Sequence, residues 1–356
     1  MTSRHRPLVR RRAPLVVAVL AVASLAACGS DGGADAAANQ DFSDWDAVVK
    51  AAEEEGTVNF YTAFNENVVA KIVDGFGKAY PNIKVVPNRK TSSLLLQQFE
   101  SEQRGGIQSA DLVTTSSPSQ IRDGCSKGTF TEVADDITAD DEHKWPEESF
   151  DGCAVIASTA FYQIWWNTEL LTEAERPKSW EDLLDPRFAG KKMMINSPAI
   201  TNSYVWMMTV AKDELGDDFL KKLGEQEPVW SESSEQAEQR VGAGEALVSL
   251  GGTKDGGQAL IDKGLPIEGF TPDPCMGTER TAGVVTNAPH PNAARLLLNW
   301  LMTPDGQAAA AEGVASALDN VPGTEPMPDC FVHEDPARSA PNSENGLAVR
   351  ELLGAP

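Results

Sequence analysis

The sequence predicts an α/β fold with two lobes connected by long strands, and three observations support this prediction. Strand-like and helical segments alternate from residue 57 to residue 118, as is typical of a parallel sheet covered by helices. After an irregular acidic region at 131–152 comes a long strand-like run, AVIASTAFYQIWWN at 154–167, and the alternation then begins again. The chain has 356 residues, 41% of them hydrophobic, which is enough to bury two cores.

The first set of elements begins with a helix at 43–55, followed by the alternating, β-rich segment TVNFYTAF at 57–64, which predicts a strand. The next helix carries five apolar side chains at helical spacing and ends before Pro81. These side chains are Val68, Val69, Ile72, Val73 and Phe76. A strand at 83–88, a helix at 92–103, a strand at 110–117 and a helix that starts at Pro118 complete the set.

The second set follows the long run. Helices are expected at 179–186, 203–211, 217–224, 233–245, 292–302 and 304–313, and strands at 191–198, 227–230, 246–252 and 280–287. Residues 334–345 are rich in Pro, Ser and Asn and are expected to form a loop. The division we expect is lobe 1 at 41–157 plus part of 278–356, and lobe 2 at 158–277.

The N-terminus has the pattern of an export signal. Five arginines precede the uncharged run LVVAVLAVASLAA, which is too short to span a bilayer comfortably. Its end, Leu25-Ala26-Ala27-Cys28, resembles the bacterial lipobox. This resemblance implies a lipoprotein signal peptide at 1–27, lipid on Cys28 and a flexible tether at 28–40. An ordinary secretory signal with a chance cysteine is the alternative.

Cleavage after residue 27 removes five of the 30 basic residues and none of the 53 acidic ones, leaving a formal charge of −28. Such a chain lacks the basic surface that binds phosphate backbones, so nucleic acid is not expected as a partner. Besides Cys28 the chain holds four cysteines, and outside the cytoplasm they suggest two disulfides. Of the three possible pairings we favour sequence neighbours, Cys125–Cys153 and Cys275–Cys330, with four free thiols as the alternative.

Several segments together resemble the extracellular solute-binding proteins of ABC importers, in the group with ferric-iron, thiamine and phosphonate binders. They are VNFYTAFNE, ADLVTTSS, WWNTELL, PKSWEDLLDPRFAGKKMMINSP, VGAGEALVSL and NAARLLLNWLMTPDGQAAAAE. The resemblance covers about residues 55–315. It implies a type II periplasmic-binding-protein fold, whose lobes close on a ligand in the cleft between them. It also implies a monomer outside the cytoplasm, lipid-anchored to the membrane, that delivers a small solute to a permease.

Ligands of open α/β sheets bind at the carboxyl ends of strands, and the loops expected there are rich in hydroxyls and amides. The candidate ligand-binding residues are Tyr61, Thr62, Asn65, Thr115, Ser116, Ser117, Asn196, Ser197, Thr201, Asn202, Trp230, Ser231, Ser233, Gly252, Thr253 and Lys254. Such groups before helices suit an oxyanion. Plain helix capping is the alternative for any single loop.

The resemblance also bears on the ligand. Ferric binders of the group use adjacent tyrosines, with His or Glu in several members. The matching stretch here, LGGTKDGG, holds no tyrosine, and Asn65 and Ser116 replace the histidine and the glutamate. A phosphonate, sulfonate or carboxylate is therefore expected, with no metal and no cofactor. Ferric iron or an iron chelate, or a thiamine-type cation stacked on Tyr61 and Trp230, is the alternative.

The sequence disfavours two other classes of protein. A secreted hydrolase is a remote alternative, because the sequence holds no H-E-x-x-H or S-x-x-K motif. The three histidines of the mature chain, His143, His290 and His333, stand beside acids or prolines. An adhesive or structural lipoprotein would not need polar loops at the strand ends. We therefore expect a binding protein and no enzyme.

Overall fold

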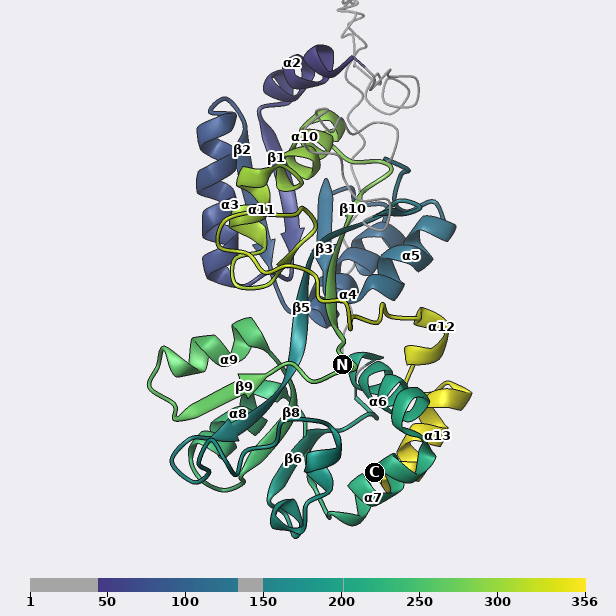
Figure 1. Cartoon of the computed structure of the whole chain (residues 1–356). Coiled ribbons are helices and arrows are strands. Elements are labelled where there is room, and N and C mark those ends of the chain that lie inside the picture. Colours follow the sequence, from purple (N-terminus) through teal and green to yellow (C-terminus); the bar gives the residue numbers. More distant parts are fainter. Residues whose placement is uncertain (1–43, 134–149, 201) are drawn as a thin grey trace, which may run out of the picture.

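The computed structural model describes residues 44–133, 150–200 and 202–356. It has two α/β lobes, one above the other, joined by the long strand β5 (Ala154–Asn167) (Figure 1). The predicted fold class is confirmed. The signal peptide, the tether, Cys28 and the candidate ligand residue Thr201 lie outside the described residues. Within the described residues, no helix combines the length and apolar character needed to cross a membrane.

Lobe 1 is built on the sheet β2–β1–β3–β10–β5. Its strands are β1 (Thr57–Thr62), β2 (Lys84–Arg89), β3 (Leu112–Thr115), the first part of β5 and β10 (Gly277–Val284), with the short β4 (Phe150–Asp151) and β11 (Ala315–Ser316) also paired to β5. Strands β1, β2 and β3 are parallel, and β10 is antiparallel to both β3 and β5. Strand β3 therefore points in the same direction as β5, towards lobe 2.

Helices cover both faces of this sheet. One core cluster lies against α2 (Trp45–Glu55), α3 (Glu66–Ala79), α10 (Pro291–Leu301) and α11 (Pro304–Ala310), and another against α4 (Ser92–Arg104) and α5 (Pro118–Ser126). Alternation along β1 sends Phe60 into the first cluster and Tyr61 into the second. The alternation of side chains along β1 thus determines the face of the sheet on which each residue lies.

Lobe 2 is built on the sheet β5–β8–β6–β7, with β9 on the other side of β5. Its strands are β6 (Met193–Asn196), β7 (Val229–Ser231), β8 (Val248–Thr253) and β9 (Ile267–Phe270). One face packs against α6 (Asn202–Leu215), α7 (Asp217–Glu225) and α13 (Glu344–Leu353), and the other against α8 (Ser234–Gly242) and α9 (Lys254–Ile261). Strands β6 and β7 run parallel to β8, which is antiparallel to β5.

The lobes meet where several chain segments cross. Strand β5 changes partners between Phe161, which pairs with β10, and Tyr162, which pairs with β8. The chain returns to lobe 1 between β9 and β10, and it crosses again between β11 and α12 (Pro336–Ser339). Helices α12 and α13, yellow in Figure 1, lie beside α6 and α7 of lobe 2. The C-terminal helices therefore belong to the second lobe.

Both disulfides have the predicted pairing. Cys125–Cys153 joins α5 to the segment before β5, with its Cα atoms 5.7 Å apart. Cys275–Cys330 joins the second and third crossings, with its Cα atoms 5.3 Å apart. Beside this second bond, the ring of Phe331 lies 5.7 Å from that of Phe161 on β5. All the crossing segments are therefore connected at one place.

The structure differs from the predicted elements in several places. The helix expected at 179–186 is a pair of 3₁₀ turns at Glu181–Leu184 and Pro186–Phe188. The segment expected to be a loop at 334–345 contains α12 and begins α13. Asp335 and Ser343 cap these helices by accepting from backbone N–H groups of Ala337 and Gly346, so the polar composition there marks caps as well as loop.

Gln307, the last residue of the Pro-Asp-Gly-Gln segment, has a structural role in lobe 1. Its fully buried amide donates to the carbonyl oxygens of Ala157 and Leu301, at 3.0 and 2.8 Å. Its amide oxygen accepts from Ser316 Oγ and from the backbone N–H of Ala317, at 2.9 and 2.8 Å. One side chain thus ties α11 to β5 and to β11.

We expect Gln307→Leu to destabilise the protein by about 2 kcal/mol, because it leaves buried backbone groups without partners. Urea unfolding monitored by circular dichroism measures this. Gln258→Leu is the control, because Gln258 is exposed on α9 and its side chain donates to Asp262. Equal unfolding midpoints for the two variants would contradict the role given to Gln307.

Candidate functional site

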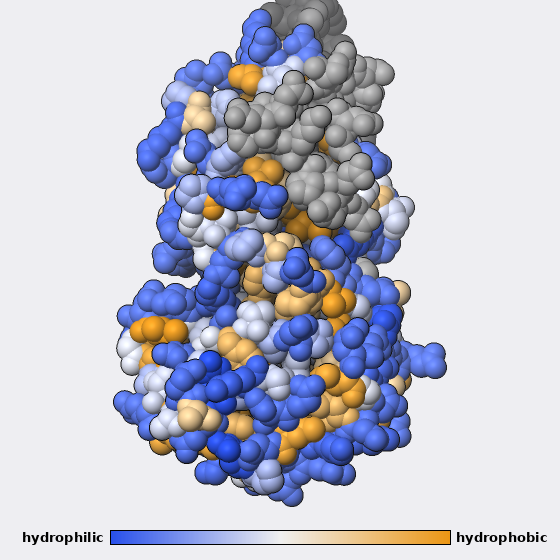
Figure 2. All heavy atoms as spheres, in the orientation of Figure 1, coloured by the Kyte–Doolittle hydropathy of each residue, from blue (hydrophilic) through white to orange (hydrophobic). Residues whose placement is uncertain are grey.

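Strand direction brings the predicted loops together at the junction of the lobes. Strand β5 runs from lobe 1 into lobe 2, and β1 and β3 share its direction, so their carboxyl ends face lobe 2. Strand β8 runs opposite to β5, and β6 and β7 share the direction of β8, so their carboxyl ends face lobe 1. Figure 2 shows that the surface narrows where these loops meet.

Many of the predicted polar residues hold these loops in shape. Thr62 Oγ1 accepts from Thr114 Oγ1 at 2.7 Å, and Thr115 Oγ1 accepts from the Ser117 N–H at 3.2 Å. In lobe 2, Ser231 Oγ donates to the Ser233 carbonyl at 2.9 Å. Asn196 and Ser197 are likewise buried, with partners at Ser234 and Ala199. These side chains order the strand ends.

Capping explains two further candidates in part. Ser233 Oγ accepts from the Gln236 N–H at the start of α8, as the capping alternative expected. Ser117 stands at the N-cap of α5, but its side chain makes no capping bond. The N-cap positions of α3 and α9, Asn65 and Thr253, likewise show no side-chain cap. None of these three side chains therefore caps a backbone N–H of the helix that follows it.

The structure does not place Tyr61 at the junction. Its side chain is 6% exposed in the cluster beneath α4, where its hydroxyl donates to Glu102 Oε2 at 3.1 Å. The reason is the alternation along β1, which turns residue 61 towards α4. Trp230 is half-buried and packs against the core of lobe 2. Neither ring supports the stacking alternative.

Gly252 and Lys254 have structural partners. A Cβ on Gly252 would lie 1.3 Å from Glu238 Oε1 and 2.9 Å from Trp165 Nε1, so the close packing of these side chains requires glycine. Lys254 Nζ pairs with Glu325 of lobe 1. This candidate ligand contact thus connects the two lobes.

Two other polar contacts cross the junction. Asn202 Nδ2, at the start of α6, lies 3.5 Å from Ser119 Oγ on α5. Asn65 Nδ2 of lobe 1 donates to Asp255 Oδ2 of lobe 2 at 3.4 Å. Ser116 contributes to the same region through its carbonyl, which accepts from Thr278 Oγ1 at 3.3 Å. The loops after β1, β3 and β8 therefore face one another.

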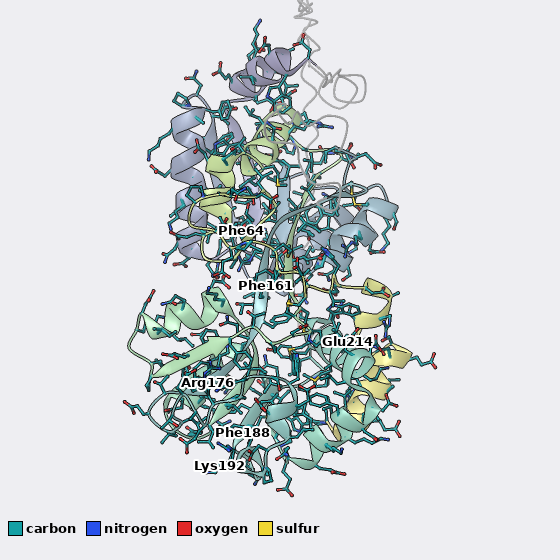
Figure 3. All side chains as sticks on the ribbon, viewed as in Figure 1. Phe64, Phe161, Arg176, Phe188, Lys192 and Glu214 are labelled. Atoms are coloured by element: carbon teal, nitrogen blue, oxygen red, sulfur yellow. A yellow bond between two sulfur atoms is a disulfide. The ribbon has the colours of Figure 1, made fainter. Side chains whose placement is uncertain are left out.

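Arg280 is the charged residue at the junction that the sequence reasoning missed. It lies on β10 at a register shift between Arg280 and Thr281, and such bulges re-aim side chains. The residue is 9% exposed, and its guanidinium lies 5.8 Å from the ring of Phe64. Figure 3 places Phe64 in lobe 1 just above the junction, with Phe161 on β5 below it. An arginine just before the small, mostly apolar run TAGVV was the available signal.

The Arg280 partner is Asp255 of lobe 2. Arg280 Nη2 lies 2.5 Å from Asp255 Oδ2, and the two side chains are 11% and 15% exposed. Burial acts to raise the pKa of the Asp255 carboxyl, but the Arg280 charge and hydrogen bonds from Thr253 and Arg280 outweigh it, and the pKa lies below its ordinary value. The Asp255 carboxyl is therefore ionised at neutral pH where it meets the guanidinium.

Two buried tyrosines stand beneath these loops in lobe 2. The rings of Tyr162 and Tyr204 stack with centroids 6.2 Å apart. Tyr204 donates its hydroxyl to the Gly251 carbonyl at 2.8 Å. Burial raises the pKa of both hydroxyls, so both remain neutral and act as hydrogen-bonding groups. Among the described residues, no group of three His, Cys, Asp or Glu side chains is arranged to hold a metal ion.

Two α/β lobes, a shared long strand and polar strand ends meeting at the junction define a binding protein of the type II periplasmic class. The model of the bacterial extracellular solute-binding protein family matches residues 71–340, so the chain belongs to that family. A Haemophilus influenzae protein described as uncharacterized is 29% identical over 154 residues. That match spans 40% of this chain and 43% of the relative, less than half of either.

Solved structures support the same fold. Iron-bound HitA from Pseudomonas aeruginosa aligns with a TM-score of 0.65 and 18% identity, over 83% of this chain and 99% of that one. AfuA from Actinobacillus pleuropneumoniae, with exogenous fructose-6-phosphate bound, aligns with a TM-score of 0.54 and 16% identity, over 84% and 97% of the two chains. At these identities the likeness concerns the fold, and the two neighbours were solved with different ligands.

Proposed function

We propose that the protein is the substrate-binding lipoprotein of an ABC importer and captures a small polar anion between its lobes. The anion is a phosphonate, a sulfonate or a carboxylate. The observation that carries this proposal is the buried Arg280 at the junction, where polar loops of both lobes meet. Guanidinium groups bind planar and tetrahedral oxyanions through paired N–H donors. The fructose-6-phosphate bound to AfuA is also an anion.

We propose as direct ligand contacts only some of the candidate residues that the sequence suggested. Asn65, Ser117 and Thr253 stand at helix N-caps without side-chain capping bonds. Ser116 and Asn202 are half-buried beside them. Hydroxyls and amides at helix N-termini favour an oxyanion. Thr201 remains a proposed contact, outside the described residues.

The proposed location and the proposed permease partner rest on the family and on the predicted signal peptide. We propose that lipid on Cys28 holds a monomeric receptor at the outer surface of the cell membrane, where it delivers solute to a permease. Closure of the lobes on the solute would let a permease distinguish loaded from empty receptor, since a ligand that contacts both lobes favours the closed form. A secreted hydrolase remains the remote alternative.

A second ligand class is an iron chelate, because iron-bound HitA has the same fold. Asn65 and Ser116 argue against direct coordination of ferric iron, because they offer neutral oxygens where ferric binders of this group offer His and Glu. An iron complex whose own ligand is an anion such as citrate would still be able to use the guanidinium of Arg280. The solute screen below includes it for this reason.

Thermal unfolding of the purified protein with a solute panel tests the proposal. The panel holds phosphonates, sulfonates, carboxylates, sugar phosphates, ferric citrate, thiamine, polyamines and neutral sugars. A solute at 100 times its dissociation constant adds about 2.7 kcal/mol and raises Tm by several degrees. We expect anions to do so and small-angle scattering to show compaction. A shift with cations or neutral sugars alone would contradict the anion class, and no shift at all would contradict solute binding.

A further inference from the structure

Donors of lobe 1 converge on one oxygen of lobe 2. The Arg280 guanidinium, at 2.5 Å, and the Asn65 amide, at 3.4 Å, both reach Asp255 Oδ2. Arg280 comes from β10 and Asn65 from the start of α3, while Asp255 belongs to the first turn of α9. The two donors form a receptor for an anionic oxygen, and a carboxylate of the protein itself occupies it.

The Asp255 carboxylate satisfies this receptor only in part. Its other oxygen, Oδ1, is buried and has no hydrogen-bond partner within the part of the chain that the structure describes. A buried acceptor without a partner costs free energy. Guanidinium groups bind best when two N–H groups meet two oxygens, and only Nη2 of Arg280 is in contact with Asp255. A solute oxyanion can therefore make contacts that Asp255 does not make.

We propose that Arg280 binds the anionic group of the solute, and that Asp255 occupies this position when solute is absent, so that solute and Asp255 compete for Arg280. This inference rests on the proposed function and names the residues that select its ligand. The solute carries a carboxylate or phosphonate. A short apolar portion next to that group would contact the ring of Phe64, which lies 5.8 Å from the guanidinium.

The surroundings allow Asp255 to leave Arg280. Asp255 stands in the first turn of α9, where the free N–H groups of the helix stabilise a carboxylate. The neighbouring pair of Lys254 with Glu325 continues to connect the lobes at the same edge. Displacement by solute therefore exchanges one anion for another at Arg280 while a second contact between the lobes persists.

Isothermal titration with methylphosphonate and with acetate tests the competition. We expect Asp255→Asn to bind a probe about tenfold or more tighter than wild type, because the competing charge is gone and tenfold corresponds to about 1.4 kcal/mol. Arg280→Gln should lose binding, and Arg280→Lys should be strongly weakened because it keeps the charge without the paired donors. Asp262→Asn is the matched control, since Asp262 is exposed at the end of α9 and bonds Gln258.

Small-angle scattering without solute gives an independent readout. Asp255→Asn should increase the radius of gyration relative to wild type and to Asp262→Asn, because the lobes lose an ionic contact. Circular dichroism verifies that each variant is folded, and Arg280→Lys serves if Arg280→Gln does not fold. Unchanged affinity in Asp255→Asn, or an unchanged radius, overturns the inference.

The remaining outcomes separate this inference from the proposed function. Wild-type affinity in folded Arg280→Gln or Arg280→Lys overturns the role of Arg280 and leaves the solute-binding function standing. Failure of both wild type and Asp255→Asn to bind either probe overturns the inference as well. Whether the solute-binding function then also falls is decided by the thermal screen with its wider panel.

Discussion

Glu238→Gln is expected to stabilise the protein by about 3 kcal/mol at pH 7 and by nearly 5 kcal/mol above pH 8. Glu238 lies on α8 and is 2% exposed. Burial, together with the nearby charges of Glu235 and Asp255, raises the pKa of its carboxyl to about 8. Its Oε1 atom has no hydrogen-bond partner among the described residues. The folded protein therefore keeps a proton on Glu238 that the unfolded chain releases.

The direction of the pH effect follows from this proton. The unfolded carboxyl ionises near pH 4.5, the ordinary value, whereas the folded one ionises near 8. Between these values the folded state binds more protons, so the free energy of unfolding falls as pH rises. Glutamine copies the protonated side chain in both states, and the variant should equal wild type near pH 4.5 and exceed it increasingly above.

Urea unfolding of wild type and variant at pH 4.5, 6, 7 and 8 measures this difference. Glu225→Gln, an exposed substitution at the end of α7, is the matched control and should leave the pH dependence unchanged. Parallel curves for wild type and Glu238→Gln across this range would show that Glu238 is ionised in the folded protein.

Loss of the Cys275–Cys330 bond is expected to cost about 4 kcal/mol, since the two cysteines are 55 residues apart and loop closure of this length restricts the unfolded chain strongly. The double variant Cys275→Ser/Cys330→Ser should also change the arrangement of the lobes. Backbone hydrogen bonds flank the bond on both sides, from the Cys275 N–H to the Cys330 carbonyl and from the Val332 N–H to the Cys275 carbonyl.

The other disulfide supplies the control. Cys125 and Cys153 are 28 residues apart and both lie in lobe 1, so Cys125→Ser/Cys153→Ser should lose a similar free energy of unfolding without affecting the junction. Urea unfolding gives the stability, and small-angle scattering gives the arrangement of the lobes. The same scattering curve for both double variants would contradict the special place of Cys275–Cys330.

Strong periodicity made most of the fold predictable, and two of the missed elements lie beside one tryptophan. The strand at 154–167 has the predicted bounds. Helix α9 and strand β9 were missed because Gly257 and Gly269 disfavour both structures locally. In each case a Cβ would approach the ring of Trp165, to 2.0 and 2.7 Å. Packing against a residue about a hundred positions away, which local pattern does not encode, determines these two glycines.

The sequence predicted the region of the site better than the individual side chains in it. Strand ends rich in hydroxyls and amides do face one another, but many of those groups bond within their own loops, as Thr62 and Ser231 do. The ion pairs depend on how the two lobes meet. Arg280 and Asp255 are 25 residues apart, and Lys254 and Glu325 are 71 apart. No spacing rule of a helix or a strand relates residues at such distances.

The placement of the C-terminal helices has a practical consequence. Helix α2 packs on α10 in lobe 1, whereas α13 packs on α6 and α7 in lobe 2. The beginning and the end of the described chain are thus attached to opposite halves of the molecule. A donor dye on the exposed Lys50 of α2 and an acceptor dye on the exposed Leu347 of α13 would convert any relative movement of the halves into a change of fluorescence energy transfer. The protein is therefore a ready scaffold for an optical sensor of whatever solute it captures.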